Sequence, residues 1–360
     1  MWSNIDTINI NGIVYTQTNI KTLSKNLENS DQWVLTIIQF LKDWFNDLDF
    51  ITSQTSGSTG IPKEIKMEKS KMVESAKATI SFFQLKENQT ALLCLPSEYI
   101  GGKMMLLRAM VAGLKLVVIK PTANPFLQLK EEEEIDFSAL TPMQMHTALK
   151  SEQNHKINNL KTIILGGSPL MNETENLMQN TNSQIYETYG MTETVSHIAL
   201  RKINGENKSS YFKALKGIHL GQDNRACLTI HAPKLLDNPI VTNDIVEFLD
   251  INGFKWLGRI DNIINSGGIK IIPEVVEEKV NTIYTKPFFI AGMPDVVLGQ
   301  KVVMIIEGEE LDSVTKLLLL NTLKEMLPKN NAPKEIYSVL LFSRTDNGKI
   351  KRLETLKKIS

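Results

Sequence analysis

Residues 55–63 bring together the groups that a polyphosphate needs. The run contains Thr55, Ser56, Gly57, Ser58, Thr59, Gly60 and Lys63, and it follows an apolar, strand-like run at 48–51. Glycines let the backbone approach a ligand closely, successive N–H groups form an anion-binding concavity, and the hydroxyls and the lysine add donors and positive charge. The spacing is not that of a P-loop, because Pro62 and Lys63 follow the second glycine. The run predicts a phosphate site between a strand and a helix, although solvated loops share this composition.

Three further stretches carry groups that suit a nucleotide. The segment 189–194 contains Tyr189, Gly190, Thr192 and Glu193. Mg²⁺ is held by one or two carboxylates together with phosphate oxygens, so a glutamate near a phosphate loop is a suitable ligand. Asp244 ends an apolar segment and is able to accept from a ribose diol, and Lys349 follows Gly348 on a turn. Each has an ordinary alternative, since isolated charged residues are usually solvated.

The composition excludes several classes of function. The 360 residues include 40 basic and 40 acidic side chains, so no net positive field points to nucleic acid or to an anionic membrane. The two cysteines, Cys94 and Cys227, lie far apart among apolar neighbours and are expected to be core residues in a reducing compartment. No run approaches the roughly 18–20 apolar residues of a membrane helix, and no signal peptide is evident. We therefore expect a soluble, cytoplasmic protein.

Strands and helices alternate through the first two thirds of the chain. The expected strands are 90–95, 115–119, 137–140, 162–165 and 184–189, and the expected helices are 68–83, 103–112, 141–149 and 169–179. A hairpin at 8–15 and a helix at 33–44 precede them, and the acidic run 131–134 is expected to be a solvated helix face. This alternation predicts an α/β fold of βαβ units with a mostly parallel sheet. Ligands bind beyond the carboxyl ends of such strands, where the polar loops 97–102, 166–168 and 189–194 fall together with the phosphate loop.

The pattern changes to paired strands from about residue 240. Strands at 246–250 and 254–257 flank an Asn-Gly turn, and later strands at 288–293, 301–307 and 336–342 alternate with helices from 273 and at 313–327. This part predicts a small α+β domain of ordinary size. We expect a large N-terminal domain at 1–258 and a mobile C-terminal domain at 259–360, with a hinge near Asp261.

In chain order these pieces resemble the adenylate-forming (AMP-binding) superfamily of acyl-CoA synthetases, peptide-synthetase adenylation domains and luciferases. The resemblance runs from residue 55 to the C-terminus, and its motifs include Gly166, Gly167 and Ser168, the 189–193 segment, Asp244, Arg259, Asp261, Gly267, Gly268, Lys270 and Lys349. Within the superfamily the chain is most similar to the o-succinylbenzoate–CoA ligases of menaquinone biosynthesis. The residues that carry this similarity are Gly101, Gly102, Lys103 and Arg108 in one helix, and 192–197 with His197.

The resemblance implies a role for each part of the nucleotide site. The 56–60 loop and Lys63 hold the β- and γ-phosphates, Glu193 carries Mg²⁺ with Thr59, and Thr192 lies at the α-phosphate. Gly167 and Tyr189 frame adenine, and Gly166, Ser168 and Gly190 are further cofactor-binding residues. Asp244 and Arg259 hold the ribose.

The resemblance also implies a reaction in two halves. ATP activates the acid as its acyl adenylate, and CoA then receives the acyl group. Lys349 bridges the acid and the α-phosphate. Rotation about Asp261 then removes Lys349 and brings the 267–270 segment to the thiol tunnel. Arg108 is expected to pair with the succinyl carboxylate, and Gly102, Tyr99 and His197 to line the acid pocket.

Two departures from the family and several alternatives stay open. The phosphate loop begins about 55 residues into the chain, where relatives have a longer segment, and relatives often carry His where Tyr99 stands. The expected partners are ATP, CoA and a small carboxylic acid, with a homo-oligomer left open. The alternatives are a ligase for another acyl or aryl acid, a stand-alone adenylation domain, and a non-catalytic nucleotide-binding regulator.

Overall fold

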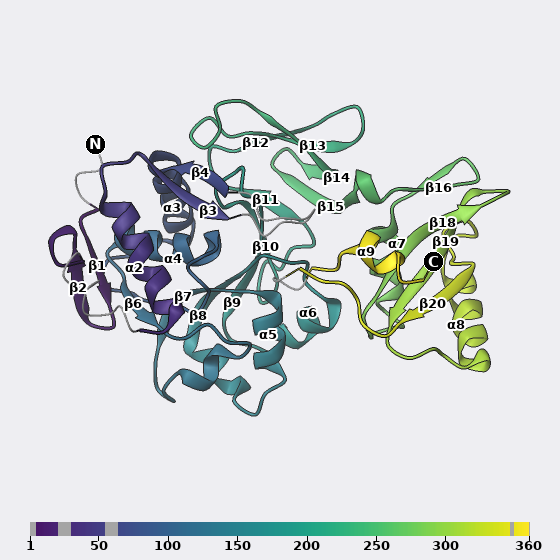
Figure 1. Cartoon of the computed structure of the whole chain (residues 1–360), viewed down its shortest axis with the longest axis horizontal. Helices are drawn as coiled ribbons and strands as arrows, with labels where there is room; N and C mark the ends of the chain where they lie inside the picture. The colour runs from purple at the N-terminus through teal and green to yellow at the C-terminus, as the bar shows by residue number, and fades with distance from the viewer. Residues whose placement is uncertain (1–4, 21–29, 55–63, 346–348, 360) are drawn as a thin grey trace. The chain divides into compact units, whose positions relative to one another are not determined.

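The computed structural model describes residues 5–20, 30–54, 64–345 and 349–359. These residues fall into two compact units, which Figure 1 colours along the chain. The first unit comprises Met1–His219 and His231–Pro239, and the second comprises Leu220–Ile230 and Ile240–Ser360. Segments 220–230 and 240–258 therefore group with the C-terminal part, while the domain boundary at 258/259 and the hinge near Asp261 stay predictions.

The first unit is built on a mixed sheet with strand order β11-β10-β9-β8-β7-β5-β6-β1-β2. Its parallel strands are β5 (Thr90–Leu93), β6 (Lys115–Val118), β7 (Ile135–Leu140), β8 (Leu160–Leu165) and β9 (Gln184–Gly190). The sheet continues with β10 (His197–Lys202) and β11 (Phe212–Ala214) on one side, and with the hairpin of β1 (Thr7–Ile10) and β2 (Ile13–Thr16) on the other. The predicted mostly parallel α/β fold is confirmed.

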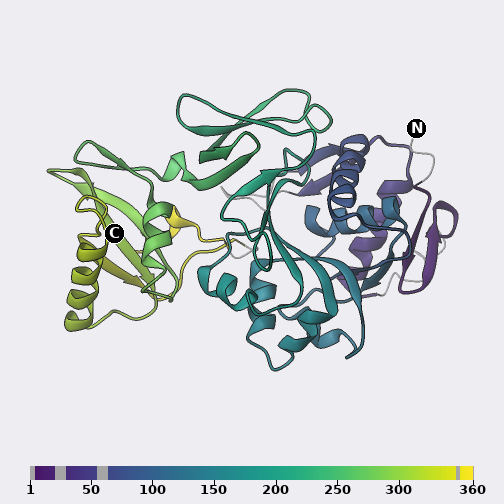
Figure 2. The same ribbon diagram turned by 180° about the vertical axis from the view of Figure 1, so that it is seen from behind.

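Helices cover both faces of this sheet because its central strands are apolar on both sides. Leu93 and Ile164 belong to the core beneath α2 (Gln32–Phe45), α3 (Lys69–Phe83) and α4 (Ile100–Ala112). Their chain neighbours Leu92 and Leu165 belong to the opposite core, with α5 (Pro142–Leu149), α6 (Asn172–Met178), η1 (Pro125–Gln128) and η2 (Asn154–Asn159). Successive side chains of a strand point to opposite faces, so the continuous apolar runs follow from burial on both sides. The opposite views in Figures 1 and 2 show α3 beside α4 and α5 beside α6.

Two local predictions in this unit were wrong. The segment 55–63 does not lead directly into a helix, because β3 (Phe50–Gln54) and β4 (Glu64–Glu68) pair as an antiparallel hairpin around it. The acidic run 131–134 forms a turn and a loop instead of a helix face. Glu131 anchors the turn by ion pairs with His155 at 2.9 Å and Lys156 at 3.0 Å.

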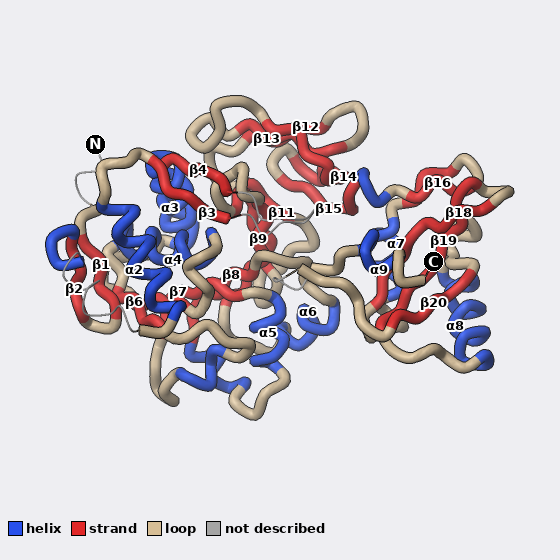
Figure 3. The backbone as a smooth tube through the Cα atoms, in the orientation of Figure 1, coloured by secondary structure: helices blue, strands red, loops and turns tan. Residues whose placement is uncertain are grey.

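The second unit contains two sheets. In the first, β12 (His219–Gln222), β13 (Cys227–His231), β14 (Ile240–Asp250) and β15 (Gly253–Arg259) are neighbours in that order, and the predicted Asn-Gly hairpin joins the last two. The second sheet has the order β17-β16-β19-β18, with β20 beside β19. The remaining elements are η3 (Ile260–Asn262), β16 (Ile264–Ser266), β17 (Ile269–Ile271), α7 (Pro273–Val280), β18 (Phe288–Asp295), β19 (Gly299–Glu307), α8 (Ser313–Met326), β20 (Glu335–Val339) and α9 (Arg352–Leu356). Figure 3 shows α8 running alongside β20.

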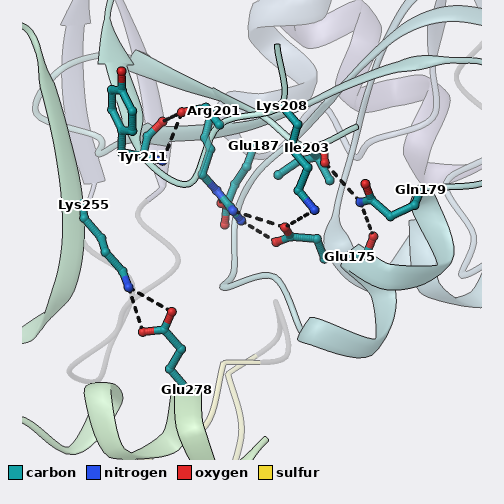
Figure 4. Close-up of polar contacts among 10 residues, drawn as sticks. Glu175, Gln179, Glu187, Arg201, Ile203, Lys208, Tyr211, Lys255 and Glu278 are labelled. Atoms are coloured by element: carbon teal, nitrogen blue, oxygen red, sulfur yellow. Dashed lines mark hydrogen bonds and ion pairs between the residues drawn. The ribbon is translucent and has the colours of Figure 1, made fainter. Parts of the chain in front are cut away.

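Strand β15 and the short η3 helix that follows it contact helix α7 through their side chains. Lys255 Nζ lies 2.9 and 3.0 Å from the two carboxylate oxygens of Glu278, as Figure 4 shows. Asn262 Nδ2 donates to Glu274 Oε1 at 2.5 Å. A Cβ at Gly258, whose φ is +154°, would lie 2.3 Å from Glu274 Oε2 and 2.7 Å from Ile272 Cγ2, so glycine lets the strand lie close to these two side chains. We call these contacts the β15–α7 clasp.

None of the helices in the described ranges is both long and apolar enough to cross a lipid bilayer.

Candidate active site

The carboxyl ends of the parallel strands bring three predicted loops to one edge of the sheet. Strands β5, β8 and β9 end at Leu93, Leu165 and Gly190, and they run in the same direction through β7. The loops that follow them contain the residues predicted to bind the acid, adenine and Mg²⁺. The predicted phosphate-binding residues Thr55, Ser56, Gly57, Ser58, Thr59, Gly60 and Lys63 lie outside the described residues.

The loop after β8 owes its shape to two glycines. Gly166 donates its N–H to the Leu140 carbonyl at 3.1 Å, and a Cβ there would lie 2.5 Å from Thr188 Oγ1. Gly167 has φ +97° and nothing near its missing side chain. Gly166 thus allows close packing against β9, while Gly167 supplies a backbone angle that other residues rarely adopt. Ser168 follows, half-buried.

The loop after β9 crosses its own backbone at Gly190. A Cβ at this position would lie 2.4 Å from the Ser196 carbonyl oxygen and 2.5 Å from His197 Cα. Thr194 Oγ1 accepts from the Met191 N–H at 3.0 Å and closes the loop. Thr192 and Glu193 stand at its tip, where the Glu193 side chain is exposed and makes no hydrogen bond or ion pair with any described residue. An exposed, unpaired carboxylate fits the predicted Mg²⁺ ligand.

A strained turn links this tip to the buried part of the loop. Val195 has φ +66°, and the Ser196 N–H donates across it to the Thr194 carbonyl at 2.7 Å. This combination is the γ-turn form with positive φ, which is rare and strained, and a β-branched residue seldom occupies it. Val195 is 4% exposed, so the surrounding core holds the strained residue in place.

Arg108 and His197 form a buried polar site behind the loop. Arg108 is 2% exposed, its Nη1 contacts Met105 Sδ at 3.8 Å, and its Nε has no hydrogen-bond partner in the described chain. Burial lowers the pKa of Arg108 to about 10. Burial, and then the charge of Arg108, lower the pKa of His197 well below 6.5, so the imidazole is neutral at pH 7. No carboxylate of the described residues pairs with the guanidinium, which leaves it able to bind an anion.

Three contacts of the candidate site were not predicted from the sequence. Ser75 Oγ lies 2.6 Å from Ser196 Oγ, and Thr79 Oγ1 lies 3.2 Å from His197 Nε2. Both α3 residues are buried, and their spacing of four places them on one face of the helix, next to its apolar stripe. Buried polar residues in such a pattern are a signal that the sequence analysis did not use. On α4, Lys103 Nζ donates to the Thr52 carbonyl at 2.8 Å and holds β3 just before the predicted phosphate-binding run.

Tyr99 and Gly102 shape the start of α4. Tyr99 is the N-cap residue of this helix. A Cβ at Gly102 would lie 2.4 Å from the Pro96 carbonyl oxygen, so the first turn of α4 packs directly on the backbone after β5. This close contact with the backbone is a sufficient reason for glycine at position 102, and no ligand is needed to explain it.

In the second unit, Lys349 lies close to both residues predicted to bind ribose. Arg259 Nη1 lies 3.8 Å from Asp244 Oδ1, and its Nη2 donates to Asp261 at 2.9 Å. Burial lowers the pKa of Lys349, Arg259 lowers it further, and Asp244 opposes the shift. Arg259 and Asp244 therefore lie near enough to the Lys349 ammonium group to shift its pKa. Lys349 is held by its own N–H, which donates to Thr345 Oγ1 at 3.1 Å.

The predicted thiol-tunnel residues form a separate turn in this unit. Gly267 and Gly268 have φ +57° and +79° and join β16 to β17 in a two-residue hairpin turn. Two successive positive φ angles are the reason for this glycine pair. Lys270 is exposed on β17.

Comparisons with known proteins agree with this arrangement. The family model "AMP-binding enzyme" matches residues 50–218. The 2-succinylbenzoate–CoA ligase of Listeria monocytogenes is 26% identical over 87% of this chain and 71% of that protein, and that of Lactococcus lactis is 26% identical over 84% and 70%.

Solved structures extend the comparison. The acyl-CoA synthetase (AMP-forming)/AMP-acid ligase II-like protein from Dyadobacter fermentans is 34% identical over 94% of this chain and 98% of that chain, with a TM-score of 0.63. The o-succinylbenzoate CoA synthetase of Bacillus subtilis, in complex with its acyl-adenylate intermediate, shares the fold at 19% identity and a TM-score of 0.69, over 84% of this chain and 68% of that chain. The predicted resemblance is confirmed, and the chain belongs to the family of AMP-binding enzymes that includes the AMP-forming acyl-CoA synthetases.

Proposed function

We propose that this AMP-forming acyl-CoA ligase acts on o-succinylbenzoate, activating it as an acyl adenylate and transferring the acyl group to CoA. The observation that carries the proposal is the buried guanidinium of Arg108, which no described carboxylate neutralises. A diacid such as o-succinylbenzoate has one carboxylate to activate and a second to be held. The relatives named 2-succinylbenzoate–CoA ligase add support for this substrate.

The acid pocket is proposed to recognise the carboxylate that is not activated. A guanidinium presents a planar set of donors that matches a carboxylate, and the unpartnered Nε adds one more. Neutral His197 adds no competing charge, and Thr79 fixes its ring. When the substrate carboxylate binds, it pairs with Arg108, so the buried positive charge gains a partner.

The first half-reaction is limited by charge, since an anion must attack a polyanion. The carboxylate oxygen forms a bond to the α-phosphorus, and pyrophosphate leaves. Preorganised positive groups aimed at the developing charge lower this barrier. We propose that Lys349 donates to the attacking carboxylate and the α-phosphate, and that Thr192 donates to the same phosphate. Asp244 accepts from the ribose, and Lys63 with the 56–60 loop holds the outer phosphates.

Residues of this chain are also proposed to bind Mg²⁺ and to position the CoA thiol. The exposed Glu193 carboxylate would hold Mg²⁺ together with Thr59, and the ion, when bound, neutralises phosphate charge. In the second half-reaction the CoA sulfur forms a bond to the acyl carbon, AMP leaves and the thiol proton is released. The hinge near Asp261 is proposed to withdraw Lys349 and to bring the turn at Gly267 and Gly268 to the thiol.

The deciding experiment is ATP–pyrophosphate exchange with a panel of aromatic and keto acids, followed by detection of the CoA thioester. We expect o-succinylbenzoate to give the highest kcat/KM and free CoA thioester to form. Faster exchange with another acid identifies an acyl- or aryl-CoA ligase of different substrate. Exchange without free thioester identifies a stand-alone adenylation domain that loads a carrier protein. Absence of exchange with every acid identifies a non-catalytic nucleotide-binding regulator.

A further inference from the structure

A buried ion network lies behind the residues that frame adenine. Arg201 on β10 pairs through Nε with Glu187 on β9 at 2.8 Å and through Nη2 with Glu175 on α6 at 2.7 Å. The three side chains are 14–18% exposed, and Figure 4 shows the arginine between the two carboxylates. None of the predicted nucleotide contacts includes these residues. We call them the 175–187–201 triad.

The 175–187–201 triad lies at the C-terminal end of the loop that follows β8. The backbone amide of Leu170, just after the predicted cofactor-binding residues 166–168, lies near Glu187 and favours the charged form of its carboxyl group. Glu175 lies in the first turn of α6, the helix that this loop enters. Arg201 pairs with the carboxylates of both Glu175 and Glu187. These ion pairs hold the end of the loop and the start of α6 against β9 and β10.

The same arginine also supports Tyr189. Arg201 and Glu187 are direct partners across β9 and β10, and Tyr189 is paired with Ala199 two residues along. The Arg201 guanidinium lies 6.0 Å from the ring of Phe212, and the Phe212 ring lies 5.8 Å from that of Tyr189. Phe212 therefore packs between the triad and the residue predicted to frame the base.

Stability alone is a poor reason for such a network. Removing charges from water costs free energy, and well-packed apolar residues often replace a buried ion pair without loss of stability. Charged groups do fix one geometry, because several hydrogen bonds must be satisfied together. This combination of an energetic cost and a defined geometry favours a role in positioning.

We propose that Glu175, Arg201 and Glu187 are positioning residues that hold the 166–170 loop and Tyr189 at the spacing that selects adenine over other bases. The inference rests on the proposed nucleotide roles of Gly167 and Tyr189. The triad itself touches no substrate.

The test is the ratio of Kd values for GTP and ATP, measured by calorimetry with Mg²⁺ and without any acid. The wild type binds ATP more tightly than GTP. In Glu187→Gln, which keeps the shape of the side chain but loses its charge, ATP binding weakens by about tenfold, near the cost of one charge-assisted contact, and the GTP/ATP ratio falls by a similar factor. The fraction of folded protein cancels in this ratio.

Asp136→Asn is the matched control. Asp136 is 16% exposed and pairs with Lys161 at 2.7 Å, but it lies at the amino end of β7, on the opposite edge of the sheet. This variant retains the wild-type ratio even if its melting temperature falls. If Glu187→Gln does not fold, Glu175→Gln, which removes the charge of the other partner of Arg201, carries the same ratio test.

An unchanged ratio in the folded variant, or a wild type without preference for ATP, overturns the inference. The measurement needs no acid, so failure to use o-succinylbenzoate would refute the proposed function and leave this test standing.

Discussion

Arg108 combines an energetic cost with a chemical use. A cation that is 2% exposed and lacks an acidic partner in the described chain destabilises the folded state. The neighbouring His197 is neutral and cannot relieve this cost. A bound carboxylate would relieve it, so affinity for an anion and instability of the free protein have the same origin. This relation predicts opposite effects of one substitution on stability and on activity.

Replacing Arg108 by Met should stabilise the protein and impair the proposed reaction. We expect the free energy of unfolding to rise by about 1–3 kcal/mol, because an unpaired buried charge is replaced by an apolar side chain of similar length. We expect kcat/KM for o-succinylbenzoate to fall by about 10²-fold, the usual scale for losing one partner of a buried charge pair. Urea denaturation and ATP–pyrophosphate exchange measure the two effects.

An analogue of the acid without the second carboxylate is the control for this substitution. Its kcat/KM should be low and nearly equal in wild type and Arg108→Met. The conservative variant Arg108→Lys keeps the charge and should retain part of the preference for the diacid. The rest should be lost, since lysine lacks the planar donor set. Equal losses for both acids in Arg108→Met would exclude a carboxylate-binding role.

His197 should make the protein sensitive to mild acid. Its folded pKa lies well below 6.5, so below this pH the unfolded chain binds a proton that the folded chain does not. Stability from this group is complete above pH 6.5 and is lost as the pH falls, by about 1.4 kcal/mol per pH unit until the folded pKa is reached. We expect His197→Gln to remove this part of the slope between pH 7 and pH 5 in thermal unfolding. A slope identical to that of the wild type would show that His197 takes up its proton equally readily in the folded and the unfolded chain.

At the scale of elements, two adjacent glycines at the start of α4 have different structural duties. A Cβ at Gly102 would meet the Pro96 carbonyl oxygen at 2.4 Å, whereas a Cβ at Gly101 would meet only Leu95 Cδ1 at 3.2 Å. Backbone cannot move as easily as the end of a leucine. The helix therefore depends on Gly102 for its position against β5 and tolerates a side chain at Gly101.

The pair offers a matched substitution test. We expect Gly102→Ala to lower the free energy of unfolding by about 1–3 kcal/mol, the typical cost of overpacking. Gly101→Ala should change it by less than about 1 kcal/mol, because helix propensity offsets the mild contact. Denaturation midpoints of the two variants measure the difference. Equal effects would mean that the first turn of α4 shifts freely.

The sequence predicted most elements because their apolar spacing is regular. The helices at α2, α3 and α8 and the parallel strands agree with their predicted ranges to within a few residues. Strand β4 was not predicted, because it is short and follows a run rich in Gly, Ser and Thr; its residues Ile65 and Met67 alternate and pack on the core. The run 131–134 was misjudged because charge alone does not distinguish a helix from a turn.

The candidate site was predictable only where residue type limits the chemistry. Arg108 and His197 were identified, but the partners Ser75 and Thr79 depend on α3 lying against the loop after β9. The 175–187–201 triad joins three elements that are distant in sequence, and cross-strand register alone brings Glu187 opposite Arg201. Such contacts follow from topology, which local patterns do not contain.

At the scale of the whole molecule, the two proposed half-reactions differ in their need for Lys349: adenylation requires it at the α-phosphate, and thioester formation proceeds with it withdrawn. Lys349→Ala should slow adenylation by about 10²-fold or more, as for the loss of one charge-stabilising donor. Thioester formation from pre-made acyl adenylate should persist, because Lys349 is proposed to be withdrawn in that step. Single-turnover assays of each half-reaction measure the two rates. Lys351→Ala, which removes a nearby lysine paired with Glu354 at 3.2 Å, is the control and should affect neither. Equal losses in both half-reactions would refute the proposed exchange of conformations.

If the proposed hinge near Asp261 operates, we expect the β15–α7 clasp to make the balance between the half-reactions depend on ionic strength. Lys255 precedes Asp261 and Glu278 follows it, so a rotation there separates their contact at 2.9 Å. The two side chains are 34% and 54% exposed, so mobile ions screen the pair, which is worth only about 0.2–1 kcal/mol. Added salt should therefore slow adenylation relative to thioester formation by up to about fivefold, and Lys255→Gln should abolish this differential response. An ordinary rise in electrolyte concentration would then redistribute the enzyme between its two working conformations without touching the residues that bind substrate.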